Sequence, residues 1–407
     1  MGILLLALVV RSLVYFSAAD PKRFLTDDAP LYVAIAKDLR GAYLDPLSPM
    51  FPIGLFRTPG YPLFLAALSA VFKDALAPVV VAQIGLSLLT VWLTVLLAGR
   101  LLGNRAAMAA GLVLAVDPVS ALFSCFIQPE ALFTVLLVGG VLGVAVAAER
   151  GDPLAALAAG LLLGLAALSR PIGLFLPLAV APAILLRRGK ARRGFVALAF
   201  LLGSAVPIGG WMTKNQIVTG APVFTIVGDS SLLHYRAAGA LAEDEGISIE
   251  EARERVWKRF SSTVTPGASV VDQSRLQRAV ALEVLGEHKL AAIRMMVYGT
   301  GRLLAGTGLT ALSHLRGESS PGAVSRPWKI VAQGLQGLAL LIAYLAVARA
   351  VMVMSWRRQF FELALSLGVV VYFVVLSAGP EANTRFRFPV APFLAVLAGH
   401  GLSWRRT

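Results

Sequence analysis

Apolar runs of about 20 residues recur along the chain, and this feature restricts its fold more than any other. Each run is long enough to cross a hydrocarbon core of roughly 30 Å as a helix. Hydrophobic residues make up 57% of the 407 residues and charged residues 15%, whereas a soluble domain carries roughly 25% charged residues. The sequence therefore predicts an all-α integral membrane protein without separate soluble domains.

We expect a bundle of about ten spanning helices with the N-terminus inside, because short cytoplasmic loops collect Lys and Arg. The apolar stretch 61–72 is too short to cross, and counting it would invert every later loop. We interpret it as a helix at the outer interface. The expected spans are residues 2–19, 79–99, 106–126, 130–148, 154–169, 172–186, 194–212, 328–352, 359–378 and 388–403.

The net charge of +14 could suggest a nucleic-acid partner. However, the basic residues gather in short loops between the apolar runs, where they report topology. We therefore expect membrane lipids, and no nucleic acid, as partners. The expected cytoplasmic residues are Arg100, Arg105, Arg150, the basic residues within 187–193, Arg357, Arg358, Arg405 and Arg406.

Two polar residues interrupt the apolar runs. Arg11 breaks the first run, which also lacks a basic n-region, so we interpret residues 1–19 as an uncleaved helix rather than a secretory signal. Arg11 either packs against polar groups inside the bundle or contacts an anionic lipid head group. Asp117 precedes Pro118, and we expect its carboxyl to satisfy backbone groups that the proline frees.

Two long segments fall on the outer side, 20–78 and 213–327. The chain therefore divides into a transmembrane module at 1–212 that contains the first outer loop, an extracytoplasmic segment, and C-terminal spans at 328–407. Within the extracytoplasmic segment we expect a helix over 248–260. We also expect an amphipathic helix over 289–312, lying on the membrane.

The first outer loop contains two adjacent acids, Asp27 and Asp28. Either can cap the following helix, whose first turn suits Pro30. Beside apolar helices, such carboxylates could instead hold a raised or guided pKa and accept a proton from a hydroxyl. A third acid, Glu130, opens an apolar run, where the helix dipole favours a negative charge.

The order of several short motifs resembles the GT-C superfamily of integral membrane glycosyltransferases. The resemblance includes protein O-mannosyltransferases and bacterial enzymes of the lipid A aminoarabinose and lipopolysaccharide-core galacturonosyl type. The motifs are D-x-x-x-Y at 28–32, R-T-P-G-Y-P-L-F-L at 57–65, Q-P-E-A-L-F-T at 128–134, G-L-A-A-L-S-R-P-I-G-L-F-L-P at 164–177, G-W-M-T-K-N at 210–215 and A-N-T-R-F-R-F-P-V-A-P at 382–392.

The resemblance implies that Asp28 acts as the base or orients the acceptor, with Asp27 as the neighbour that could replace it. Glu130 would complete the active site or, with Asp28, ligate a divalent cation. Several cations on the outer side could grip a lipid phosphate, although snorkelling to the interface would explain any single one. The expected substrate-binding residues are Tyr32, Arg57, Tyr61, Arg170, Lys214, Asn215, Arg385 and Arg387.

The implied activity is transfer of a hexose or pentose from a polyprenyl-phosphate donor to a lipid or glycan acceptor of the cell envelope, for example in lipopolysaccharide. The site would face the periplasm from the plasma (inner) membrane. The single Cys125 and four scattered histidines show no metal-ligand spacing, and a glycine loop for a nucleotide is absent. The alternatives are a transporter or flippase of the same carriers, a non-catalytic assembly subunit, or a polysaccharide polymerase or ligase.

Overall fold

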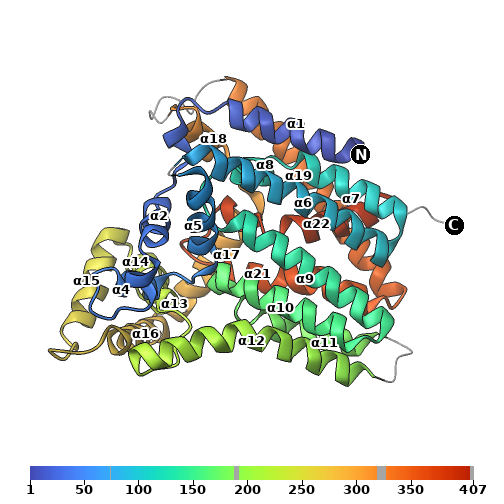
Figure 1. Ribbon diagram of the computed structural model, residues 1–407. Coiled ribbons are helices and arrows are strands. Elements are labelled where there is room, and N and C mark those ends of the chain that lie inside the picture. Colours follow the sequence, from blue (N-terminus) through green and yellow to red (C-terminus); the bar gives the residue numbers. More distant parts are fainter. Residues whose placement is uncertain (74, 188–191, 319–326, 404–407) are drawn as a thin grey trace.

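The computed structural model describes residues 1–73, 75–187, 192–318 and 327–403, so Arg188, Lys190, Arg405 and Arg406 lie outside the described residues. Within these ranges the chain is helical and contains no strand (Figure 1). The first half contains α1 (Gly2–Phe16), η1 (Pro21–Phe24), α2 (Ala29–Lys37), α3 (Leu39–Tyr43), α4 (Phe51–Phe56), α5 (Gly60–Phe72), α6 (Leu76–Leu102), α7 (Asn104–Val116), α8 (Pro118–Phe123), α9 (Glu130–Arg150), α10 (Pro153–Ser169), η2 (Pro171–Gly173) and α11 (Leu176–Leu186). The second half contains α12 (Arg193–Thr219), α13 (Val227–Ser231), η3 (Leu232–Ala237), α14 (Ala238–Glu245), α15 (Ile249–Ser261), α16 (Val270–Glu287), α17 (Lys289–Ala305), α18 (Leu309–Leu315), α19 (Pro327–Trp356), α20 (Phe360–Leu363), η5 (Ala364–Gly368), α21 (Val369–Ser377), η6 (Thr384–Arg387) and α22 (Ala391–Ser403).

The predicted all-α membrane bundle is confirmed. Among the described residues, five helical runs are long and apolar enough to cross a membrane: α6, α9, α12, most of α19, and Phe360–Ser377. Shorter apolar helices accompany them, including α1, α5, α7, α10 and α22. In Figure 1, α6, α9, α10 and α12 lie side by side, while α13 to α16 gather at one end of the bundle with α2 and α4.

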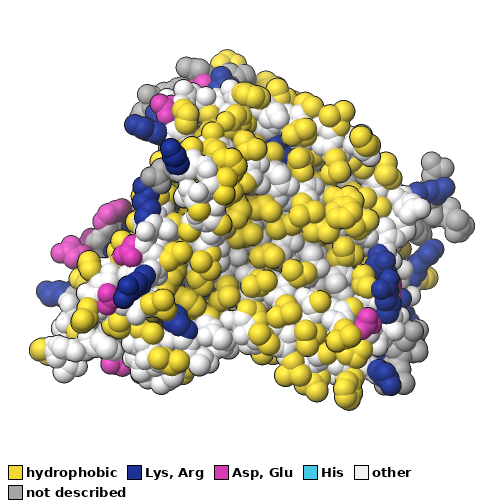
Figure 2. Space-filling view, viewed as in Figure 1, with side chains coloured by type: hydrophobic (Ala, Val, Ile, Leu, Met, Phe, Trp, Pro, Cys, Tyr) yellow, Lys and Arg dark blue, Asp and Glu magenta, His cyan; other side chains and the backbone are white. Residues whose placement is uncertain are grey.

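Charged side chains collect at the ends of the bundle. Figure 2 shows one face on which hydrophobic side chains cover the middle, and Lys and Arg lie at either end. At the end away from α13 to α16, Arg100 Nη1 lies 2.5 Å from a carboxylate oxygen of Glu149, and Arg187 Nη1 lies 3.0 Å from one of Glu362. Arg100 and Arg187 are two of the basic residues that the sequence analysis assigned to the cytoplasm.

The expected span at 106–126 is not one helix. Helix α7 ends at Val116 and α8 begins at Pro118, because proline cannot continue the hydrogen-bond ladder of a helix. The carboxyl of Asp117 accepts hydrogen bonds from the Ser120 backbone N–H at 2.7 Å and the Ser120 hydroxyl at 2.6 Å. The interpretation of Asp117 as a partner for freed backbone groups is therefore confirmed.

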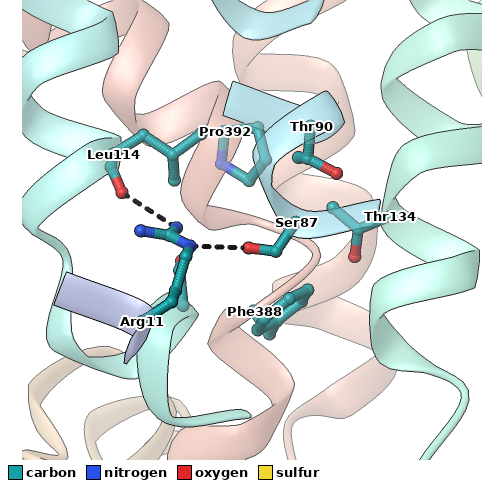
Figure 3. Close-up of a pocket in the computed structure, with 8 residues that line it drawn as sticks. Arg11, Ser87, Thr90, Leu114, Thr134, Phe388 and Pro392 are labelled. Carbon is teal, nitrogen blue, oxygen red and sulfur yellow. Dashed lines mark hydrogen bonds between the residues drawn. The ribbon is translucent and has the colours of Figure 1, made fainter. Parts of the chain in front are cut away.

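Arg11 is fully buried and packs inside the bundle rather than at a lipid head group. Its guanidinium donates to the Leu114 carbonyl at 3.4 Å and to the Ser87 hydroxyl at 2.9 Å (Figure 3), and also to the Ala115 carbonyl at 2.8 Å. In an unbroken helix, the Leu114 carbonyl would accept from residue 118, but Pro118 has no N–H. Arg11 thus supplies hydrogen-bond donors to carbonyl groups at the break between α7 and α8, where Pro118 removes a backbone donor.

Helices α10 and α12 cross at very short range through two glycines. A Cβ atom on Gly160 would collide with the Phe200 carbonyl oxygen, and one on Gly203 would collide with the Leu157 carbonyl oxygen. Because backbone atoms cannot rotate away, only glycine fits either position. Small residues at such crossings let helices approach closely in membranes. This packing fixes α10, whose C-terminus leads into Arg170.

The described part of the long polar segment 213–327 folds into a helical layer. The expected helix at 248–260 is confirmed as α15, and its apolar face packs against α14, η3 and α16. The prediction of a single amphipathic helix over 289–312 is wrong. Helix α17 ends at Ala305 and α18 begins at Leu309, because Gly308 adopts a left-handed conformation at φ +74° that helices exclude.

Substituting Gly160→Ala should destabilise the protein by about 1–3 kcal/mol, because the added methyl group forces α10 away from α12. Thermal unfolding in detergent measures this change. Gly209→Ala on α12 is the matched control, since nothing lies within 4 Å of the Cβ position there. Equal unfolding temperatures for the two variants would contradict the close crossing.

Candidate active site

A single backbone bridge aligns the two segments that carry the acids. Leu25 pairs in parallel with Ile127, and the Ile127 N–H donates to the Phe24 carbonyl at 2.9 Å. Asp28 follows Leu25 by three residues, and Glu130 follows Ile127 by three residues. Since the paired segments run in the same direction, the bridge brings both acids to the same end of the bundle.

Arg385 joins the two acids directly. Its Nη1 lies 3.0 Å from Asp28 Oδ2, and its Nε donates to Glu130 Oε1. A second arginine reaches each acid: Arg57 Nη2 lies 2.7 Å from Asp28 Oδ1, and Arg170 Nη1 lies 3.1 Å from Glu130 Oε1. The side chain of Glu130 is 0% exposed and that of Asp28 is 35% exposed, so the site is a buried charge cluster with one more accessible carboxylate.

Capping does not account for Asp28. The residue occupies the N-cap position of α2, and Pro30 lies in the first turn as expected, but the Asp28 side chain makes no capping hydrogen bond. Both of its oxygens contact arginines instead. Asp27 is exposed and makes no ion pair among the described residues. Of the two adjacent acids, Asp28 is therefore the one at the charge cluster.

The outer layer holds Arg385 in place. The Asn383 side chain accepts from the Arg385 backbone N–H at 2.9 Å and caps η6. The loop before it is fixed from two helical elements: Arg236 Nε lies 3.1 Å from Glu381, and Arg302 donates to the two carbonyls just before Glu381 at 3.2 and 3.0 Å. The long polar segment 213–327 thus positions a residue of the charge cluster.

Aromatic rings line the cluster. The Arg57 guanidinium lies 5.0 Å from the ring centroid of Tyr32, which meets Tyr61 edge to face at 5.1 Å. Arg170 lies between two rings, 5.8 Å from Phe133 and 5.7 Å from Phe386. Guanidinium groups held by rings and carboxylates are fixed in position, so snorkelling does not describe these two arginines.

The charge cluster sets the protonation of Asp28. Burial would raise the pKa of the Asp28 carboxyl, but the charges of Arg57 and Arg385 outweigh burial and lower that pKa below its ordinary value. The alternative of a raised pKa is therefore wrong for Asp28. Its carboxylate is ionised at neutral pH and can accept a proton.

Lys214 and Asn215 contact the adjoining outer segments rather than the carboxylates. The Lys214 ammonium donates to the Tyr43 carbonyl at 3.0 Å and lies 3.8 Å from the ring centroid of Trp211. The Asn215 amide donates to the Val223 carbonyl at 2.6 Å. The structure thus places these two residues in the wall beside α3 rather than in ion pairs with the acids.

Arg387 points to the C-terminal end of α17. Its Nη1 donates to the carbonyls of Leu304 at 2.6 Å and Gly306 at 3.0 Å, while Nη2 is buried without a hydrogen-bond partner. It is therefore not one of the arginines that contact Asp28 or Glu130.

The donor atoms of the cluster do not fit a divalent cation. Among the described residues there is no group of three or more His, Cys, Asp or Glu side chains that could hold one. Guanidinium groups engage both oxygens of Asp28 and one oxygen of Glu130, and the Arg385 charge lies between the acids. Calcium and magnesium need several free oxygen ligands, which this arrangement does not supply.

Three residues with unpartnered polar atoms were not singled out from the sequence. The hydroxyls of Thr26 and Thr58 and the amide of Gln128 are buried, and none of them has a hydrogen-bond partner in the part of the chain that the structure describes. Each lies one or two residues from Asp28, Arg57 or Glu130. For Gln128, the sequence did offer a signal, because it is a polar residue within the apolar stretch before Glu130.

Sequence comparison identifies one matching family. The family model described as dolichyl-phosphate-mannose-protein mannosyltransferase matches residues 56–211. This segment includes Arg57, Glu130 and Arg170. No curated protein has a matching sequence.

Two solved archaeal structures show the same fold at low identity, and a third solved structure is similar to this chain. The apo oligosaccharyltransferase of Archaeoglobus fulgidus superposes with a TM-score of 0.56 and 14% identity, covering 98% of this chain and 50% of that one. The oligosaccharyltransferase AglB from Archaeoglobus fulgidus, in complex with an inhibitory peptide and a dolichol-phosphate, gives 0.54 and 13%, covering 98% and 49%. ArnT from Cupriavidus metallidurans bound to undecaprenyl phosphate gives 0.41 and 15%, covering 98% and 76%. The chain spans about half the length of the archaeal enzyme.

Removing Arg385 should leave Glu130 buried with one cation fewer, so Arg385→Met is expected to destabilise the protein by about 3–5 kcal/mol. Adding Glu130→Gln should recover part of this loss, because the uncompensated charge disappears. Thermal unfolding in detergent measures the double-mutant cycle. Arg255→Met, in an exposed ion pair, is the control and should change stability little. Additive effects of the two site substitutions would contradict the coupling.

Proposed function

We propose that this chain is a glycosyltransferase of the GT-C superfamily that uses a polyprenyl-phosphate sugar as its donor; the family match over residues 56–211 and the fold shared with the archaeal oligosaccharyltransferase support this proposal. The observation that carries the proposal is the Arg385 link between Asp28 and Glu130. It places an accessible carboxylate and a group of guanidiniums at one point. Such a transfer needs these two functions together, a proton acceptor and a phosphate site.

The charge of the cluster matches this donor. Three guanidinium groups, from Arg57, Arg170 and Arg385, face the two carboxylates, which leaves one positive charge in excess. A phosphate that bridges a sugar and a polyprenol carries one negative charge. Arginines bind phosphate through paired charge-assisted hydrogen bonds. The archaeal enzyme solved with a dolichol-phosphate supports a lipid phosphate as the ligand class.

The proposed reaction is a single displacement with inversion at the anomeric carbon. The acceptor oxygen bonds to the anomeric carbon as the bond from that carbon to the phosphate oxygen breaks, and the acceptor proton passes to Asp28. The departing phosphate gains one negative charge in the same step in which Asp28 loses one. The excess positive charge of the cluster therefore rises as the phosphate charge grows, and this stabilises the departing group.

The remaining assignments follow from this mechanism. The site lies at the end of the bundle opposite the ion-paired basic loops, so we place it on the periplasmic side of the plasma (inner) membrane. The donor sugar is a hexose or pentose, and the acceptor is a lipid or glycan of the cell envelope. Tyr32, Tyr61, Lys214, Asn215 and Arg387 would complete the walls of the substrate site. In this mechanism Arg385, rather than a divalent cation, supplies the positive charge between the acids.

Transfer by the purified protein tests the proposal. In detergent, with a radiolabelled undecaprenyl-phosphate hexose and a hydroxyl-bearing lipid acceptor, the protein should release undecaprenyl phosphate and a labelled product. A transporter or flippase moves its substrate between compartments and would release neither product. If the labelled donor lipid stays intact with every acceptor offered, this result would contradict the proposed glycosyltransferase activity.

The Asp28→Asn substitution should lower the transfer rate by about 10²- to 10⁴-fold, because it removes the proton acceptor. Asp27→Asn is the matched variant and should keep most of the rate, since Asp27 is exposed and contacts no arginine. Single-turnover rates with saturating donor separate loss of chemistry from loss of binding. A larger loss in Asp27→Asn would move the role of base to Asp27.

The pH profile of kcat/KM should lack an acid limb near neutrality. The pKa of Asp28 is lowered, so the active ionised form persists as pH falls and is lost only below the ordinary range of an aspartate carboxyl. Arg57→Met removes one of the charges that lower this pKa, so its acid limb should appear at higher pH than in the wild type. Identical acid limbs would show that the limb belongs to another group.

A further inference from the structure

Gln128 is a buried amide that finds no partner within the described residues. Its side chain is 1% exposed, yet neither Oε1 nor Nε2 makes a hydrogen bond. Buried polar groups in folded proteins are nearly always paired. The contrast with Gln83 is direct: that amide is also 1% exposed, but it accepts from the Tyr61 hydroxyl and donates to the Phe126 carbonyl, each at 2.6 Å.

The bridge between Leu25 and Ile127 brings Gln128 close to Thr26. Both bridged residues contribute to the same apolar cluster. Thr26 and Gln128 each follow a bridged residue in segments that run in the same direction, so the two residues lie side by side after the bridge. The Thr26 hydroxyl is likewise buried without a partner.

Both residues belong to the segments that lead to the reacting groups. Thr26 precedes Asp28 by two residues, and Gln128 precedes Glu130 by two residues. Among the described residues, the second oxygen of Glu130 is also buried without a partner. In the proposed reaction the anomeric carbon lies between Asp28 and the phosphate bound by the arginines, and the segments that carry Thr26 and Gln128 lead to this point.

We propose that Gln128, assisted by Thr26, binds two adjacent hydroxyl groups of the transferred sugar and makes the enzyme selective for donors that carry both. A carboxamide has a donor and an acceptor side by side, which matches a vicinal diol: one hydroxyl donates to Oε1, and its neighbour accepts from Nε2. A deoxy sugar would leave part of the amide unpaired and would be rejected. This assignment rests on the proposed function.

The experiment compares Gln128→Leu with Gln83→Leu in the purified full-length protein. The donors are an undecaprenyl-phosphate hexose and its monodeoxy analogues, and the readouts are kcat/KM and the thermal unfolding temperature in detergent. For the wild type, kcat/KM should fall roughly 10- to 100-fold when either hydroxyl that contacts Gln128 is absent. Gln128→Leu should lower kcat/KM for the full donor by a similar factor and abolish the discrimination.

The stability readout separates a ligand-binding amide from a structural one. Gln128→Leu should keep the wild-type unfolding temperature, because it breaks no bond within the protein. Gln83→Leu should lower that temperature, because it leaves the Tyr61 hydroxyl and the Phe126 carbonyl unpaired. The ratio of rates for the full and deoxy donors should stay as in the wild type for Gln83→Leu.

Two results would overturn the assignment of Gln128 while leaving the glycosyltransferase in place. One is a Gln128→Leu variant that transfers sugar and still discriminates against the same deoxy donors as the wild type. The other is a loss of unfolding temperature equal to that of Gln83→Leu, which would show partners for the amide within the protein. Absence of transfer by the wild type from every polyprenyl-phosphate donor would overturn the proposed function, and this assignment with it.

Discussion

The contact of Arg385 with both Asp28 and Glu130 is the interaction on which the rest of the structure depends. It joins the first outer loop, the start of α9 and the loop before α22, which are far apart in the sequence. Glu130 is fully buried, and a buried carboxylate without compensating charge is strongly unfavourable. The bundle therefore has to close around this point, so stability and the arrangement of the site are secured by the same contacts.

The helices of the long polar segment serve this arrangement. Arg236 in η3 and Arg302 in α17 hold the loop that leads to Arg385, and the bridge at Leu25 holds the segment that leads to Asp28. The transmembrane helices supply Glu130 and, through the close crossing of α10 and α12, Arg170. The long polar segment is consequently part of the site, although Glu130 and Arg170 both belong to the membrane bundle.

The sequence predicted the features that depend on composition and charge. Apolar length identified the membrane helices, and the basic loops that contain Arg100 and Arg187 do carry ion pairs at the end of the bundle away from Asp28. The grouping of Asp28, Glu130, Arg170 and Arg385 followed from motif order. The sequence did not predict features that depend on a single backbone conformation or on a long-range contact. The positive φ of Gly308 divides α17 from α18. The bridge from Leu25 to Ile127 joins segments about 100 residues apart.

The burial of Arg11 has a consequence for the order in which the protein enters the membrane. Its hydrogen-bond partners Ser87, Leu114 and Ala115 belong to α6 and α7, which the ribosome makes after α1. An arginine at the centre of a lone helix strongly opposes entry into lipid. Helix α1 therefore completes its insertion only when α6 and α7 arrive, and these three helices enter the bilayer as a cooperative unit.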